Sequence, residues 1–281
     1  MDLSRRSAAF DGEKPVSSGS PRLEYRFMVE TASAAPASSP ALLTASQVAQ
    51  QAQVVQAPNG ICYASFGATH LAESDLERTV QAVPASVAAA LSRRAYYFVP
   101  LTIHEDEQVS IAPDYTVELG DRAICHRNVP FGSSEYTFIS TRLMHDRFAL
   151  AFEFFINAGH HFVETVGVPE SFHEMVTSQA RAGVRGETSH DAWESRRRAF
   201  DPQHKGQEDE QAKNAYFAAT FADTLAIYML SLTVDFDYVD LREREYPLLT
   251  APALAERLRH VAALFPPNSG YEFEIRYRRR S

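Results

Sequence analysis

The sequence predicts an α+β fold, with a small mixed sheet and helices in the N-terminal half and a mainly helical C-terminal half. Short runs rich in aromatic and β-branched residues alternate with helical patterns as far as residue 141, which indicates several strands that need not be parallel. Two long apolar stretches with helical spacing, residues 144–169 and 211–236, dominate the second half of the chain. These observations together favour a mixed first half and a helical second half.

Composition limits the function classes. The chain has 281 residues and a net charge of −9, which argues against nucleic acid as a partner because phosphate binding requires a basic surface. Two cysteines do not form the framework of a disulfide-rich secreted domain. No apolar run reaches membrane-spanning length, and the N-terminus is polar rather than a secretory signal. A cytoplasmic location is therefore expected, or secretion into a host cell by a route that needs no signal peptide.

The N-terminal 40 residues are predicted to be a disordered segment and linker. Residues 1–21 are rich in Ser, Gly, Pro and charge, and residues 31–40 contain only Thr, Ala, Ser and Pro. Between them, Leu23–Glu30 could form a first strand. Residues 41–281 are expected to form a single α+β domain, with a polar insertion at about 183–213 that could be a lid, a partner-binding loop or disordered.

The first part of that domain is predicted to alternate between helix and strand. Residues 42–55 favour a short helix and residues 61–66 a buried strand. Ser74 and Glu77 have the spacing of a capping box at the start of a helix that Pro84 divides in two. The predicted strands after this helix are residues 95–103, 115–125 and 135–141, with an acidic loop at 104–107 and a loop containing Pro130, Phe131 and Gly132.

The second part is predicted to be mainly helical. The expected helices are residues 144–169, 170–182, 211–236 and 252–264. At the C-terminal end, residues 270–280 alternate between apolar and charged side chains, which predicts a strand with one covered face.

The first long helix, residues 144–169, has polar groups in an apolar pattern. His160 and Glu164 are four residues apart and share a helical face, and Asp223 lies in the middle of the second long helix. The plainest interpretation is a structural polar cluster of Asn157, His160, His161, Glu164 and Asp223, hydrogen-bonded between the two helices. The alternative is a metal site with His160, Glu164 and Asp223 as ligands, a mixed set that suits zinc or another divalent metal.

Two short stretches resemble the zinc-binding motifs of the zincin-like metallopeptidases of the anthrax lethal factor type. Residues 155–164 resemble the HExGHH signature from the glycine onward, but Ile156 stands where the first histidine ligand belongs and Asn157 where the catalytic glutamate belongs. Residues 214–223 resemble the stretch that supplies the third ligand, with Ala215 and Ala219 at its acidic positions. The order of elements is similar as well, over roughly residues 70–265.

This resemblance implies a zincin-like fold with a degenerate zinc site. Only His160 matches a ligand position, and one imidazole does not hold zinc, so no cofactor is expected. The chain would then be a catalytically degenerate metallopeptidase-like protein that acts by binding a protein partner. Three lysines against twenty-four arginines, together with the polar N-terminus, suggest a translocated bacterial effector or toxin-like protein, because lysine is the residue that ubiquitination targets.

A function from a different class also fits the residues. A metal-dependent enzyme, either a hydrolase or an oxygenase, could use His160, Glu164 and Asp223 as a rearranged site. The two hypotheses differ in whether a metal binds at all.

Overall fold

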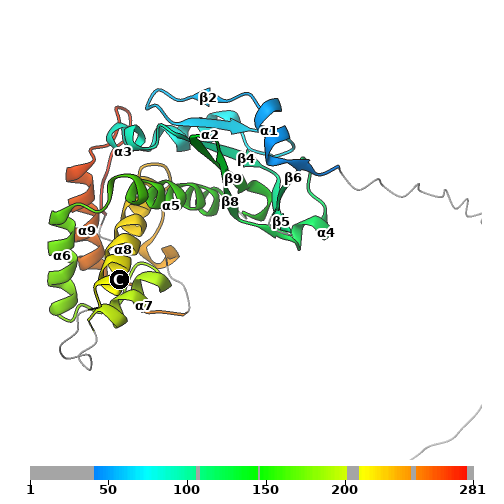
Figure 1. Ribbon diagram of the computed structural model, residues 1–281. Helices are drawn as coiled ribbons and strands as arrows, with labels where there is room; N and C mark the ends of the chain where they lie inside the picture. The colour runs from blue at the N-terminus through cyan, green and yellow to red at the C-terminus, as the bar shows by residue number, and fades with distance from the viewer. Residues whose placement is uncertain (1–40, 106–107, 145, 201–208, 242–244, 277–281) are drawn as a thin grey trace, which may run out of the picture. The chain divides into compact units, whose positions relative to one another are not determined.

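The computed structural model describes residues 41–105, 108–144, 146–200, 209–241 and 245–276 (Figure 1). Residues 40–281 group as one compact unit. The predicted disordered segment and linker, including the possible strand Leu23–Glu30, lie outside the described residues, as do two residues of the predicted acidic loop. No helix among the residues described is long and apolar enough to cross a membrane.

The fold is α+β, with two sheets in the N-terminal half and mostly helices in the C-terminal half. A four-stranded antiparallel sheet has the order β1-β6-β5-β7, and a five-stranded mixed sheet has the order β2-β3-β4-β9-β8. The strands are β1 Leu43–Thr44, β2 Val55–Gln56, β3 Cys62–Ser65, β4 Arg94–Val99, β5 Leu101–Glu105, β6 Gln108–Ala112, β7 Ala123–Ile124, β8 His126–Phe131 and β9 Ser134–Ser140. In the second sheet β3, β4 and β9 are parallel, and the outer strands β2 and β8 are antiparallel to their neighbours.

Helices join and cover these strands. They are α1 Ala45–Gln51, α2 Glu73–Gln81, α3 Ala85–Ala90, α4 Val117–Gly120, α5 Arg147–Val166, α6 Glu170–Arg181, α7 His190–Ala199, α8 Glu210–Ser231 and α9 Ala251–Leu264, with 3₁₀ turns η1 Thr141–Leu143 and η2 Tyr238–Leu241. In Figure 1, α5 lies beside β8 and β9, and α6, α8 and α9 are grouped at its other end.

The strand β4 separates two hydrophobic cores. Its side chains alternate between the two faces of the sheet. Tyr96 and Phe98 join the larger core, which contains α5, α8 and α9. Ala95, Tyr97 and Val99 join a smaller core with residues of α1 and β6. Polar side chains on the Tyr96 face of the sheet therefore point toward α5.

Several predicted elements are confirmed. The helix before residue 94 is divided at Pro84 into α2 and α3, and the two long apolar stretches form α5 and α8. The expected capping box at Ser74 is wrong. The helix α2 begins at Glu73, and the residue at its N-cap position is Ala72, which has no side-chain cap.

Other predicted strands differ from the structure. The expected single sheet is two sheets, because Pro100 divides the predicted strand 95–103 into β4 and β5, which belong to different sheets. The predicted strand 115–125 contains the short helix α4 and only the two-residue strand β7. Pro130 and Phe131 belong to β8 rather than to a loop.

The predicted C-terminal strand is also wrong over its described part. Residues 271–276 have no regular secondary structure and pair with no strand in the described chain. Tyr271, Phe273 and Ile275 pack against the larger core, and the Tyr271 hydroxyl donates to the carbonyl of Arg78 at 2.7 Å. The alternation therefore reflects one face packed on helices rather than sheet pairing.

The predicted polar insertion at 183–213 contains a helix and a buried glutamate that is paired with two arginines. Within it α7 packs against α8, and residues 201–208 lie outside the described residues. Glu187 is fully buried, and its carboxylate accepts from Arg257 at 2.8 Å, Arg196 at 2.9 Å and the Tyr216 hydroxyl at 2.9 Å. Gly186 permits this path, because its φ is +88° and a Cβ would lie 2.2 Å from the carbonyl oxygen of Leu248.

The two long helices touch at Gly159. A Cβ at this position would lie 2.7 Å from the carbonyl oxygen of Ala222 on α8, so only glycine allows the two backbones to approach so closely. This contact sets the position of α5 between α8 and the sheet.

Replacing Gly159 with Ala is expected to lower the free energy of unfolding by about 1–3 kcal/mol, because the methyl group forces α5 and α8 apart. Helix propensity alone would give the opposite sign, a gain of about 1 kcal/mol. Urea unfolding of the two proteins measures the difference. A variant as stable as the native chain, or more stable, would contradict the close contact.

Candidate functional site

The helix α5 presents a polar row to the five-stranded sheet. It begins after Asp146, whose carboxylate accepts from the amide of Ala149 at 2.9 Å, and it ends at Gly167 with φ +88°. Asn157 and His161, one turn apart, are buried on the side that contacts the sheet. A polar cluster therefore lies within the interface between α5 and strands β4, β8 and β9.

His161 is the centre of this cluster. It is 1% exposed, and both of its ring nitrogens have protein partners. Nδ1 lies 3.0 Å from the hydroxyl of Tyr96 on β4, and Nε2 lies 3.0 Å from the amide nitrogen of Asn128 on β8. The side-chain oxygen Oδ1 of Asn128 in turn accepts from the hydroxyl of Thr137 on β9 at 2.9 Å. One imidazole thus links α5 to β4 and β8 directly, and to β9 through Asn128.

This arrangement holds His161 in its neutral form. The Asn128 amide donates to Nε2, so Nδ1 carries the proton and donates to the Tyr96 hydroxyl. Burial, and after it the positive charge of Arg94, lowers the pKa of His161 to about 3. At neutral pH the ring is a hydrogen-bonding group and carries no charge.

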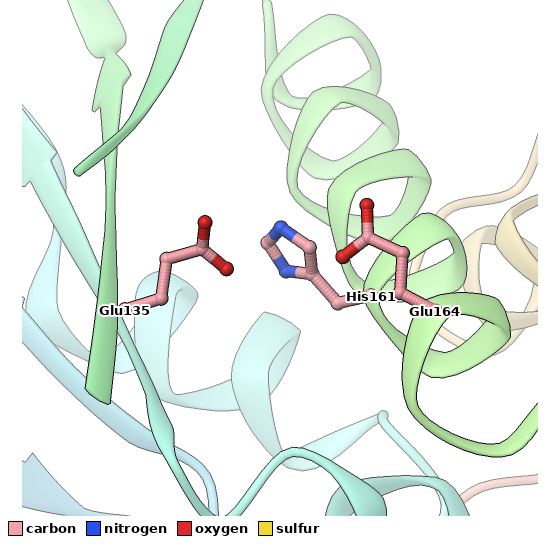
Figure 2. Close-up of side chains that lie close together, drawn as sticks. All are labelled: Glu135, His161 and Glu164. Carbon is pink, nitrogen blue, oxygen red and sulfur yellow. The ribbon is translucent and has the colours of Figure 1, made fainter. Parts of the chain in front are cut away.

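Arg94 supplies the positive charge of the cluster. It stands at the start of β4, directly beside Glu135 in the parallel register with β9. Its guanidinium forms ion pairs with Glu135 and with Glu164 of α5, the latter at 2.8 Å. Figure 2 shows Glu135 reaching from its strand toward His161, with Glu164 on the same helix as His161.

Three side chains of the cluster are of types that can bind a metal ion. Ligand atoms of Glu135, His161 and Glu164 all lie within 4.8 Å of one another, and this is the one such group of three among the residues that the structure describes. A divalent cation does not fit the arrangement as it stands. Both nitrogens of His161 are engaged in hydrogen bonds, and the guanidinium of Arg94 is paired with both carboxylates.

The predicted ligands His160, Glu164 and Asp223 are not brought together as a group of this kind in the described chain. His160 is exposed, whereas Asp223 is 4% exposed and accepts from the Thr188 hydroxyl at 2.8 Å. Burial raises the pKa of Asp223 to about 6. The predicted cluster of five residues is therefore divided, with Asp223 on the side of α8 that meets the segment before α7.

Asn157 and Ile156 differ from the residues that the zinc-binding motif has at their positions. Asn157 stands where the resembling motif has its general base, and its amide donates to the carbonyl of Glu153 at 2.8 Å. A carboxamide cannot accept a proton at neutral pH. Ile156 stands at the place of the first ligand and packs against the larger core.

A histidine–carboxylate contact lies at the edge of the cluster. Nδ1 of His126, the first residue of β8, lies 2.5 Å from a carboxylate oxygen of Glu153 on α5. This pair joins the outer strand of the sheet to the helix, one turn before Asn157.

Sequence reasoning missed most of this cluster, namely Arg94, Tyr96, Asn128 and Glu135. Strand alternation offered a signal. Arg94, Tyr96 and Phe98 share one face of β4, and a charged residue on a face that is otherwise aromatic requires a partner. That partner, Glu135, begins a strand that was predicted, but the parallel pairing of the two strands was not.

Comparisons of the sequence with protein-family models, with curated proteins and with solved structures give no match.

Proposed function

We propose that this chain is a catalytically degenerate, metallopeptidase-like scaffold that acts by binding another protein. One observation carries the proposal. The guanidinium of Arg94 lies between Glu135 and Glu164, beside a neutral His161 whose two nitrogens have protein partners. The guanidinium thus pairs with the two carboxylates that could otherwise bind a metal. Unlike a metal ion, it offers no coordination position at which water could be activated.

The order of elements supports the metallopeptidase-like part of the proposal. The divided helix α2/α3, the aromatic strand β4, the strand β9 and the long helix α5 occur in the order that the resemblance implies, although β5, β6, α4, β7 and β8 lie between β4 and β9. Ile156 and Asn157 replace a ligand and the general base on that helix. Residues from roughly 70 to 265 would form the zincin-like scaffold.

The outer strand β8 supports the protein-binding part. It pairs with β9 on one side and with no strand on its other side in the described chain. Pro130 fits this arrangement, because an edge strand tolerates a residue without an amide proton. An edge strand can accept an extended segment of another protein through main-chain hydrogen bonds. The scarcity of lysine suits a partner met inside a ubiquitin-using host cell, so the bacterial effector or toxin-like role remains part of this proposal.

The second candidate function is a metal-dependent enzyme. The observation that favours it is the proximity of Glu135, His161 and Glu164, which differs from the predicted set His160, Glu164 and Asp223. It would require Arg94 to leave both carboxylates and His161 to release one hydrogen-bond partner.

Zinc titration by calorimetry, with elemental analysis of the purified protein, separates the two candidates. We expect the native chain to retain no stoichiometric zinc. Arg94→Ala is expected to bind zinc at least about tenfold more tightly, because it leaves two neighbouring carboxylates without their counter-charge.

Arg197→Ala is the matched control, since Arg197 forms an exposed pair with Glu194 far along the chain from the cluster, and it should bind zinc as the native chain does. One equivalent of zinc in the native protein, lost in both His161→Ala and Glu164→Ala, would overturn the proposal in favour of the enzyme.

A further inference from the structure

A separate cavity of about 300 Å³ lies between α2, the start of α5 and the carboxyl ends of β4 and β9. It is distinct from the His161 cluster. Arg94 and Phe98 are four residues apart on β4, which at about 3.3 Å per residue places the cluster and the cavity roughly 13 Å apart along the strand. The carboxyl ends of parallel strands are a common position for ligand sites, and the volume is at the lower end of the range for small-molecule pockets.

The cavity has an apolar floor and a polar rim. Leu76, Phe98 and Ala151 belong to the buried core and also line the cavity. Thr141 and Thr69 close one side, where the Thr141 hydroxyl donates to the carbonyl of Thr69 at 3.1 Å. The floor can therefore contact an aliphatic group, whereas orientation would depend on groups at the rim.

His70 at the rim has a strained backbone. Its φ of +60° makes it the one residue other than glycine with a positive φ in the part of the chain that the structure describes. This conformation costs roughly 1–2 kcal/mol for an L-residue, and such strain is concentrated at functional sites. The preceding turn is tightly held, because Ala68 donates to the carbonyl of Pro113 at 2.8 Å and a Cβ on Gly67 would lie 2.5 Å from the same oxygen.

Arg142 is the charged group that the strained turn meets. It lies in η1, directly after β9, and its guanidinium is 3.0 Å from the ring nitrogens of His70 and 5.2 Å from the ring centroid of Tyr115. No carboxylate forms an ion pair with it among the described residues. Arg147, the other arginine of the cavity, is paired with Asp75 at 3.2 Å. Within the described chain, the contacts of the Arg142 guanidinium are thus with a histidine ring and a tyrosine ring.

We propose that this cavity binds a small monocarboxylic acid, with its aliphatic part on Phe98 and Leu76 and its carboxylate on Arg142. A guanidinium presents parallel donors that match a carboxylate. Asp75 and Asp146 also line the cavity, so a doubly charged phosphate would meet about twice the repulsion that a single carboxylate meets. The proposal is independent of protein binding at β8.

Calorimetry and ligand-observed NMR of the full chain with hexanoate test this assignment, with hexan-1-ol and inorganic phosphate as matched ligands. Hexanoate should bind saturably and at least about tenfold more tightly than either of the other two. Arg142→Gln should weaken hexanoate binding by about tenfold or more, because it removes a charge-assisted pair. Arg142→Lys should restore only part of the affinity, because an ammonium lacks the fork of donors.

Two further variants keep the test decisive. Arg197→Gln removes an exposed cation elsewhere and should leave binding unchanged, and Ala151→Leu should abolish binding by filling the cavity while thermal melting confirms that it folds. Equal binding of hexanoate and hexan-1-ol, native-like binding by Arg142→Gln, or tighter binding of phosphate would each overturn the assignment.

Discussion

Replacing Glu187 with Ala is expected to lower the free energy of unfolding by about 3–5 kcal/mol, because it leaves buried positive charge without a partner. Arg257 is fully buried and the side chain of Arg196 is 12% exposed, and both donate to the Glu187 carboxylate. A domain of this kind is stable by about 5–15 kcal/mol in total, so the variant should lose a large share of its stability. Urea unfolding followed by circular dichroism measures the loss.

The matched control is Glu194→Ala on the neighbouring helix α7. Glu194 pairs with Arg197, but both side chains are substantially exposed, so its removal should cost no more than about 0.5 kcal/mol. The double variant Glu187→Ala/Arg257→Leu should be more stable than Glu187→Ala, because the most deeply buried orphan charge is gone. Similar losses in Glu187→Ala and Glu194→Ala would contradict the buried network.

The apolar periodicity of the sequence predicts the elements that pack one face against a single hydrophobic core. The two long helices are predicted from apolar spacing; α5 lies within the predicted range 144–169, and α8 ends at Ser231, five residues before the predicted end. Pairing was not predictable in the same way. The C-terminal residues 271–276 alternate as a strand does, yet they contact helices, because a period of two records a covered face and not what covers it.

The candidate site shows the same division. Sequence spacing identified the polar residues of α5, including His161 and Glu164, but it assigned Asp223 of α8 to them. The partners came instead from Arg94 and Glu135, which are distant in sequence and meet only through the parallel register of β4 and β9. The sequence does not indicate the role of Glu187 for a related reason. Glu187 lies in a polar segment, and only the folded chain shows that its partner Arg257 is buried.

Acid is expected to destabilise the native chain through His161. Its pKa is about 3 in the folded protein against an ordinary value of 6.5, so the unfolded state binds the proton more readily between these values. The contribution is complete above about pH 6.5 and falls as the pH approaches 3. At 1.36 kcal/mol for each pH unit, lowering the pH from 7 to 4.5 should remove about 2–3 kcal/mol through this group alone.

The variant His161→Gln tests this contribution, because glutamine can hydrogen-bond to Tyr96 and Asn128 but does not titrate. Its free energy of unfolding should fall less than that of the native chain between pH 7 and pH 4.5, by about 2–3 kcal/mol. Other titrating groups are common to both proteins and cancel in the comparison. Equal losses in the two proteins would show that His161 is not held neutral by burial.

Asp223 gives a control of opposite sign. Its pKa is raised to about 6 in the folded protein, so between its ordinary value of 3.8 and 6 the folded state binds the proton more readily, and this group adds stability as the pH falls. Asp223→Asn should therefore make the acid loss steeper than in the native chain, whereas His161→Gln makes it shallower. The two buried groups have different partners, Tyr96 and Asn128 for His161 and Thr188 for Asp223, and divergent slopes would show that each titrates in its own environment.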